Sequence, residues 1–258
     1  MIENSTKEKL ARGETVFGCF LTDANPSLAE LVALQGWDFL VFDGEHGPLQ
    51  PADVANLARA AELRGVTPIA RATTNLPHVI LRFMDAGVHG IHVPWVNTPG
   101  EVESAVRSVK YGPRGQRGLA GSRASDWGRF ETIGDYTVRA NRETMLIIHI
   151  ETIDAVDAVE AYAQVDDVDV LFIGPTDLSH SMGHPGETEH PDVVAAMERV
   201  TEVVTTSDKA LGVYAGTEVD ARKWMQRGAR YITTGLPGFI RRGMQPFLAN
   251  LRSRGAQS

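Results

Sequence analysis

The stretch MLIIHIETIDAVDAVEAYAQVDDVDVLFIG, residues 145–174, decides the fold of this chain. It begins with an apolar run at 145–151, continues with apolar residues at helical spacing over 153–163, and ends with a second apolar run at 169–174. Near-continuous apolar runs are typical of parallel strands, because helices cover one face of such a sheet and packed side chains fill the other. The stretch therefore predicts a strand–helix–strand unit of a parallel sheet.

The same alternation extends over the rest of the chain in both directions. The predicted strands lie at 16–22, 39–45, 67–72, 90–96, 145–151, 169–174, 210–216 and 230–235. The predicted helices lie at 26–35, 51–63, 77–86, 99–109, 153–163, 191–206, 218–227 and 238–253. This repetition in a chain of 258 residues predicts an α/β fold, a closed (β/α)8 TIM barrel, as a single domain over residues 1–258.

The rival architecture, an open doubly wound sheet, lacks its usual motifs. The first predicted strand is not followed by the G-x-G-x-x-G turn of a dinucleotide site, and G-x-x-x-x-G-K-[ST] occurs nowhere, so no nucleotide cofactor is expected. The Gly- and Arg-rich segment 110–143 interrupts the alternation and is too long for an ordinary connection. We expect it to lack a regular element, and long loops of this kind are often functional lids.

The composition is that of an ordinary globular protein, with 43% hydrophobic and 22% charged residues, which excludes disordered, collagen-like and disulfide-rich classes. The formal net charge of −8 disfavours nucleic acid and anionic membranes as partners, so a small molecule is expected. The polar start has no signal peptide and no apolar run approaches the roughly 18–20 residues of a membrane span, which predicts a cytoplasmic protein. Cys19, the only cysteine, is predicted to be a buried core thiol.

Polar residues at the carboxyl ends of the predicted strands mark the candidate active site, because the segments of a barrel converge only there. They are Asp43, Glu45, His46, Arg71, Glu151 and Asp177. The carboxylates of Glu151 and Asp177 come from neighbouring strands and can approach each other closely only around a cation, for which Mg²⁺, Mn²⁺ or Co²⁺ is suited. The alternative is that each of the two carboxylates caps the helix that follows it.

His46 and Arg71 add a base and a permanent cation to this set. Histidine can transfer protons near neutral pH when a neighbour fixes its ring, and Asp43 lies close enough in sequence to do so. The alternative is an ordinary surface or core histidine. Arg71 interrupts an apolar strand and needs an anionic partner, which is either a substrate oxyanion or Glu45 in a structural salt bridge.

The positions of the other basic residues bear on the reaction mechanism and on substrate binding. No predicted strand ends on a lysine, which argues against a Schiff-base mechanism; the lysines are Lys7, Lys9, Lys110, Lys209 and Lys223. In the glycine-rich segment 112–123, three arginines are candidates for binding anionic substrate groups, the alternative being a plain flexible loop. They are Arg114, Arg117 and Arg123.

Several motifs together resemble one enzyme family. They are FDGEHGPLQ (42–50), ARATTN (70–75), Asp-Ala-Gly (85–87), YGPRGQRG (111–118), IETIDAV (150–156) and IGPTDLSHSMG (173–183). In order and spacing they resemble the class II pyruvate aldolases typified by 4-hydroxy-2-oxoheptanedioate aldolase, within the HpcH/HpaI aldolase/citrate lyase superfamily. The similarity spans almost the whole chain and implies a barrel of the phosphoenolpyruvate/pyruvate-binding type.

The resemblance implies roles for individual residues. Glu151 and Asp177 are implied as the ligands of the divalent metal, Arg71 as the contact of the keto oxygen that stabilises the enolate, and His46, paired with Asp43, as the general base acting through a metal-bound water. The segment Gly174, Pro175, Thr176 and Asp177 is implied to hold the pyruvate carboxylate, and Trp95 and Ser125 to contribute to substrate binding. Asp85 is expected to reach the mouth of a neighbouring subunit, and the C-terminal helix to be exchanged between subunits in a trimer or hexamer.

The sequence departs from the family pattern at two positions. His149 stands where the family usually has Gln, and a period of two places it on the same barrel face as Glu151, so it is a candidate third ligand, a partner of a metal-bound water, or a determinant of substrate fit. Trp95 stands where a smaller residue is expected and would narrow the pocket for the aldehyde.

The function expected from these features is reversible aldol cleavage of a 4-hydroxy-2-oxo acid to pyruvate, or an analogue such as hydroxypyruvate, and an aldehyde. Two alternatives stay open at this point. One is a lyase acting on a CoA thioester, and the other is a catalytically silent barrel that binds a metal or an oxo acid.

Overall fold

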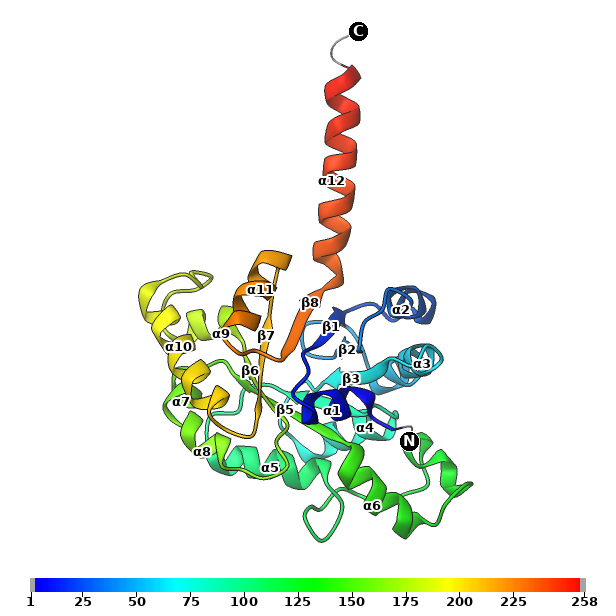
Figure 1. Cartoon of the computed structure of the whole chain (residues 1–258). Helices are drawn as coiled ribbons and strands as arrows, with labels where there is room; N and C mark the ends of the chain where they lie inside the picture. Colours follow the sequence, from blue (N-terminus) through cyan, green and yellow to red (C-terminus); the bar gives the residue numbers. More distant parts are fainter. Residues whose placement is uncertain (1–2, 256–258) are drawn as a thin grey trace.

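The strands close into a barrel, as predicted. The computed structural model describes residues 3–255, and within that range eight parallel strands pair in sequence order, with the last strand returning to the first (Figure 1). The predicted domain includes residues 1–2 and 256–258, which lie outside the described residues. The strands are β1 (Val16–Leu21), β2 (Phe39–Asp43), β3 (Thr67–Arg71), β4 (Gly90–Val93), β5 (Met145–Ile150), β6 (Val170–Ile173), β7 (Ala210–Tyr214) and β8 (Tyr231–Gly235).

Helices connect the strands and surround the barrel. Several begin with proline directly after the capping residue, as at Pro26, Pro51 and Pro99. Proline is tolerated there because the first-turn amides of a helix have no intrahelical partner to lose. The helices are α1 (Ser5–Ala11), α2 (Pro26–Ala33), α3 (Pro51–Glu62), α4 (Pro77–Asp85), α5 (Pro99–Val109), η1 (Arg123–Gly128), α6 (Ile133–Glu143), α7 (Ile153–Asp157), α8 (Val159–Ala163), α9 (Pro175–Ser181), α10 (Pro191–Thr205), α11 (Glu218–Gln226) and α12 (Leu236–Gly255).

Strand side chains alternate between two cores. One set, including Leu40 and Phe42, packs outward beneath the helices, and the other, including Phe39 and Val41, fills the barrel interior. Cys19 belongs to the outer core, where it is fully buried, and this burial raises the pKa of its thiol to about 12. The prediction of a core thiol is confirmed.

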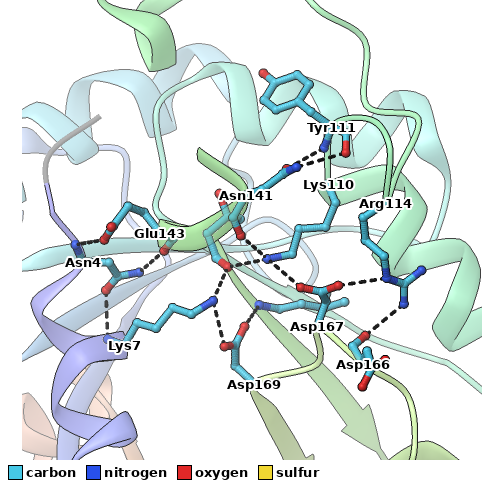
Figure 2. A network of polar contacts seen from close by, with 12 residues as sticks. Asn4, Lys7, Lys110, Tyr111, Arg114, Asn141, Glu143, Asp166, Asp167 and Asp169 are labelled. Atoms are coloured by element: carbon cyan, nitrogen blue, oxygen red, sulfur yellow. Dashed lines mark hydrogen bonds and ion pairs between the residues drawn. The ribbon is translucent and has the colours of Figure 1, made fainter. Parts of the chain in front are cut away.

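A polar network closes the barrel at the amino ends of the strands (Figure 2). The Nζ atom of Lys110 donates to the carbonyl oxygens of Asn141 at 2.6 Å and Thr144 at 3.1 Å, and lies 3.6 Å from the carboxylate of Asp167. Lys7 of α1 donates to the same Thr144 carbonyl at 2.9 Å. Burial of Lys110 lowers its pKa to about 8. This lysine therefore joins the ends of α5 and α6 at the end of the barrel opposite the predicted active site.

The structure corrects several predicted elements. The segment 110–143 is not irregular throughout, because it contains η1 and α6, and the side chains of Tyr136 and Ala140 in α6 are buried. The predicted helix 153–163 is divided at Ala158 into α7 and α8. The fourth strand ends at Val93, since Trp95 has a φ of 53° that no strand accommodates.

The last helix leaves the barrel instead of covering it. Figure 1 shows α12 projecting away from the strands. Leu236 packs against the barrel, but most of the other apolar side chains of the helix are exposed, namely Phe239, Ile240, Met244, Phe247, Leu248 and Leu251. A groove of about 250 Å³, lined among others by Trp37, Ala221 and Ile232, lies over β1 and β8. No helix of the described range is long and apolar enough to cross a membrane.

Candidate active site

The carboxyl ends of the strands surround a cavity of about 520 Å³. Its lining brings together most of the polar residues that the sequence singled out, although they lie far apart along the chain. These are Asp43, His46, Arg71, His149, Glu151, Gly174, Pro175, Thr176 and Asp177. Aromatic and small residues complete the wall, namely Phe20, Thr22, Phe172, Tyr214, Gly235 and Pro237.

Arg71 is held by two acidic neighbours. Its Nε donates to Oδ1 of Asp43 at 2.8 Å, its Nη2 donates to Oδ2 at 2.5 Å, and its Nη1 lies 3.1 Å from Glu45. Burial opposes ionisation of Asp43, but the bonds from Arg71 outweigh it and lower the pKa of this carboxyl. The ion pair between Arg71 and Glu45 exists, yet Asp43 is the bidentate partner because its two oxygens match the guanidinium fork.

Glu151 is a buried carboxylate with 2% of its surface exposed. Its Oε1 accepts the backbone N–H of Trp95 at 2.6 Å, and its Oε2 lies 2.9 Å from Nδ1 of His149. Burial raises the pKa of Glu151, but the His149 ring and the Trp95 amide outweigh burial and lower it. The helix-cap alternative is wrong for this residue, because Thr152 caps α7 by accepting from the backbone of Ala155.

Asp177 lies in the first turn of α9 and lines the same cavity. The capping residue of this helix is Gly174, so the cap alternative is wrong here too. Within residues 3–255 the Asp177 carboxylate has no hydrogen bond or ion pair. A Cβ atom at Gly174 would lie 2.9 Å from Oε2 of Glu151, so glycine keeps the space beside that carboxylate open.

His46 lies at the cavity with an exposed side chain. Its backbone N–H donates to Asp43 at 3.1 Å, as does that of Glu45 at 3.0 Å. The predicted pairing of Asp43 with the imidazole ring is not present in this structure: Asp43 accepts from the guanidinium of Arg71 and from backbone N–H groups, and no hydrogen bond joins it to the ring. Asp43 instead fixes the loop that carries His46.

Three residues predicted to act on the substrate do not line the cavity of their own chain. Trp95 lies beside it and donates through Nε1 to Glu45 at 2.9 Å. Asp85, at the end of α4, accepts from the buried Arg117 at 2.9 Å. The hydroxyl of Ser125 donates to the Ser122 carbonyl within its own turn. The predicted roles of Asp85 and Ser125 therefore require a second subunit.

The arginines of the segment 112–123 are occupied by carboxylates of the same chain. Arg114 pairs with Glu103 and Asp167, Arg117 with Asp85, and Arg123 with Glu62. None of the three lines the cavity. The prediction that this segment binds an anionic substrate group is not supported within one chain, because each guanidinium already has an internal counterion.

Sequence reasoning missed a second set of interior residues. His92 is the register partner of Arg71 on the next strand, and Tyr231 begins β8. The aromatic rings of Phe20 and Phe172 pack against His92 with centroid distances of 5.5 and 5.2 Å. The signal that could have identified this set is a histidine inside the apolar run at 90–96, since His92 is the register partner of Arg71 and faces the same side of the sheet.

A second cluster of side chains of metal-ligating type lies in the loop before α10 and in the first turn of that helix. It comprises His184, His190 and Asp192, whose donor atoms lie within 4.8 Å of one another. The two imidazole rings are stacked with centroids 3.5 Å apart and planes 16° from parallel. Because imidazole lone pairs lie in the ring plane, stacked rings do not aim both lone pairs at one point, and we assign no site here.

The comparisons with known proteins agree with the fold and the cavity. A family model described as HpcH/HpaI aldolase/citrate lyase matches residues 16–241. The chain is 34% identical over 232 residues to the 5-keto-4-deoxy-D-glucarate aldolase of Shigella boydii serotype 18, which covers 90% of each protein. This chain therefore belongs to the HpcH/HpaI aldolase/citrate lyase family and is an enzyme of the aldolase and lyase class.

Solved structures show the same relationship. An HpcH/HpaI aldolase/citrate lyase family protein from Burkholderia cenocepacia J2315 superposes with a TM-score of 0.92 at 34% identity, covering 96% of this chain and 99% of that one. The citrate synthase SbnG superposes with a TM-score of 0.87 at 31% identity, covering 97% and 98%. The relatives of this chain are thus named for different reactions, and membership of the family does not by itself identify the substrate.

Proposed function

We propose that this chain catalyses reversible aldol cleavage of a 4-hydroxy-2-oxo acid to pyruvate, or an analogue such as hydroxypyruvate, and an aldehyde, with a divalent metal ion held by Glu151 and Asp177. One observation carries the proposal: an ionised, buried Glu151 and an unpaired Asp177 share a cavity with Arg71. The name of the aldolase relative supports the substrate class. Numbered from its keto end, 5-keto-4-deoxy-D-glucarate is itself a 4-hydroxy-2-oxo acid.

The donor set fits a divalent cation. Asp43 and Glu45 already neutralise Arg71, so the charges of Glu151 and Asp177 are left without a basic partner among the described arginines and lysines. Carboxylate oxygens with room for further oxygen ligands suit Mg²⁺, Mn²⁺ or Co²⁺. When bound, such an ion would supply Lewis-acid stabilisation of an enolate.

Arg71 would contact the keto oxygen of the substrate. Its guanidinium is held on one edge by Asp43, so its position does not depend on the substrate being present. A fixed cation beside an oxygen that gains negative charge lowers the barrier to forming the enolate. The guanidinium is already in place when the charge develops, so no free energy is spent on moving it during the reaction.

His46 is the base of the proposed mechanism. Its ring reaches the cavity from an exposed loop, and no described side chain occupies the ring nitrogens. The imidazole would take a proton from the pyruvate methyl group and return it in the reverse direction.

The start of α9 would hold the substrate carboxylate. The backbone N–H groups of Thr176 and Asp177 lie in the first turn, where no intrahelical carbonyl is available to them. Both residues line the cavity, so these amides can donate to an anion there.

Proton exchange at the pyruvate methyl group tests this function directly. In deuterium oxide with Mg²⁺, the enzyme should exchange these protons, and Asp177→Asn should slow the exchange by at least about 100-fold because one ligand charge is lost. The matched control is Glu189→Gln, which removes the same charge from an exposed position in the loop after α9 and should leave the rate unchanged.

Two outcomes would reject the mechanism. One is exchange that persists in Asp177→Asn and after chelation of divalent ions. The other is inactivation by borohydride in the presence of pyruvate, which would reveal a lysine Schiff base.

The thioester-lyase alternative has only fold-level support. A citrate lyase beta subunit from M. tuberculosis superposes with a TM-score of 0.57 at 13% identity. Turnover of malyl-CoA in preference to free 4-hydroxy-2-oxo acids would favour this alternative, and absence of methyl exchange would favour a silent barrel.

We also propose that the active enzyme is a homo-oligomer, a trimer or hexamer, in which α12 is exchanged between subunits. The first turns of α12 border the groove over β1 and β8, where Phe239 packs against Trp37, but the exposed apolar residues farther along the helix, Met244, Phe247, Leu248 and Leu251, are left for a partner subunit to cover. Such an assembly would also supply the second subunit that roles for Asp85 and Ser125 require.

A further inference from the structure

A chain of hydrogen bonds runs through the barrel interior behind the cavity. The hydroxyl of Tyr231 lies 2.8 Å from Nε2 of His92, Nδ1 of His92 lies 2.9 Å from Nε2 of His149, and Nδ1 of His149 lies 2.9 Å from Oε2 of Glu151. All four side chains are at most 2% exposed. The chain therefore connects the core of the barrel to a proposed metal ligand at the wall of the cavity.

The carboxylate end fixes the direction of the first bond. An ionised carboxylate only accepts, so Nδ1 of His149 carries the proton that bonds Glu151. Nε2 of His149 faces Nδ1 of His92, and the direction of that bond follows from the phenol end of the chain.

The phenol end fixes the direction of the other two bonds. Among the described residues, His92 is the sole hydrogen-bond partner of the buried Tyr231 hydroxyl. A buried O–H without an acceptor costs free energy, so Tyr231 donates and Nε2 of His92 accepts. Burial lowers the pKa of His92 well below its ordinary value, which keeps that ring neutral. With Nε2 accepting, the proton of His92 lies on Nδ1 and donates to Nε2 of His149, so the two ends together specify one arrangement in which every polar atom of the chain is satisfied.

We propose that Tyr231, His92 and His149 form a positioning chain that fixes the carboxylate of Glu151 for metal binding, and that His149 is not itself a metal ligand. This role rests on the proposed function, since it concerns the metal of that reaction. Of the three roles left open for His149 by the sequence, direct ligation is excluded because both ring nitrogens are occupied within the chain.

The contacts of Glu151 show what the positioning chain achieves. His149 holds Oε2, and the backbone N–H of Trp95 holds Oε1 at 2.6 Å. Each oxygen accepts one such bond and retains capacity for another, which is available to a cation. A carboxylate held at both oxygens loses little rotamer freedom when the ion binds, so the affinity is higher than for a mobile side chain.

The bond directions can be tested in the metal-free protein. Long-range ¹H–¹⁵N correlation spectra of the histidine rings should show that His92 and His149 both carry their proton on Nδ1 and leave Nε2 unprotonated. Addition of Mg²⁺ or Zn²⁺ should leave the Nδ1 proton of His149 in place. A proton on Nε2 of His149, or loss of its Nδ1 proton when metal is added, would overturn the proposal.

The positioning role can be tested by metal affinity. His149→Ala should weaken Mn²⁺ binding in calorimetry by about 10–100-fold, the usual loss when a partner of a ligand is removed. His149→Gln should restore most of the affinity, because its amide N–H₂ can donate to Glu151. Tyr231→Phe should give a smaller loss, and the control Tyr136→Phe, a buried phenol outside the chain, should give none.

Failure of this inference is distinct from failure of the proposed function. If Mn²⁺ binds equally to His149→Ala and to the unaltered protein, the positioning role is wrong while the metal site stands. If Mn²⁺ does not bind to the unaltered protein at all, the proposed function fails, and the ring spectra still report whether the chain of bonds exists.

Discussion

The role of Asp43 depends on which neighbouring side chain forms hydrogen bonds with its carboxylate. Its position near His46 in the sequence favours pairing with that imidazole, whereas the sheet places it beside Arg71 as a register partner. The guanidinium offers two parallel charged donors, so it takes both carboxylate oxygens. The ring of His46 is left unheld, and Asp43 becomes the residue that positions Arg71.

Arg71→Lys should lower kcat by about 100–1,000-fold, because a lysine ammonium cannot reproduce the bidentate hold and the donor beside the keto oxygen is displaced. Steady-state kinetics of aldol cleavage would measure the change. Arg64→Lys is the matched control, since Arg64 pairs with Glu30 on the surface and its replacement should leave kcat unaltered. A kcat within a factor of a few of the original for Arg71→Lys would show that Arg71 has no such role.

Glu151 and Asp177 could be predicted as site residues from the sequence, because each follows the carboxyl end of a recognisable strand. The structure places both at one cavity. The hydrogen-bonded chain of His92, His149 and Tyr231 could not be predicted in the same way. It joins three strands that lie far apart in the sequence, and strand alternation alone does not tell which interior side chains touch.

At the scale of elements, the strands were predicted better than their connections. Apolar runs define strands directly, but a positive φ at Trp95 or a break at Ala158 depends on local contacts that composition does not reveal. The sequence did not predict helix α6, because the glycine-rich residues before it are typical of a loop and only its capping residue, Thr132, marks where the helix begins.

The network at the amino ends of the strands predicts an unusual pH dependence of stability. The folded-state pKa of Lys110 is about 8 against an ordinary 10.5, so between these values the unfolded chain holds a proton that the folded chain has lost. Stability therefore rises with pH across this window, by about 3 kcal/mol from this group. Lys110→Met should abolish that rise in urea unfolding.

Lys223→Met provides the comparison, because Lys223 is exposed on α11 and its replacement should leave the slope between about pH 8 and 10.5 as it was. The difference in slope, and not the absolute stability, is the quantity to compare, since Lys110→Met also removes two hydrogen bonds to carbonyls. Equal slopes in all three proteins would show that Lys110 titrates normally.

At the scale of the whole molecule, α12 determines the assembly. Phe247→Glu places a charge on its exposed apolar face, and burying that charge against a partner would be costly. We expect light scattering after size exclusion to show trimers or hexamers for the unaltered protein and smaller species for Phe247→Glu. Gln245→Glu, a charge added to the same helix outside the apolar set, should leave the mass unchanged; a monomeric unaltered protein would contradict the exchange.

The rate at which Cys19 is alkylated measures how often the packed structure opens. The chain has this one sulfhydryl, which is fully buried between the strands and the helices and has a pKa of about 12, so an alkylating reagent can reach it only when this outer core opens. Adduct formation followed by mass spectrometry should be slow in buffer and accelerate with urea. Leu63→Cys in a Cys19→Ser background, at a site 68% exposed, should be modified at once. Rapid modification of Cys19 in buffer would mean that the helices covering the outer core move readily away from β1.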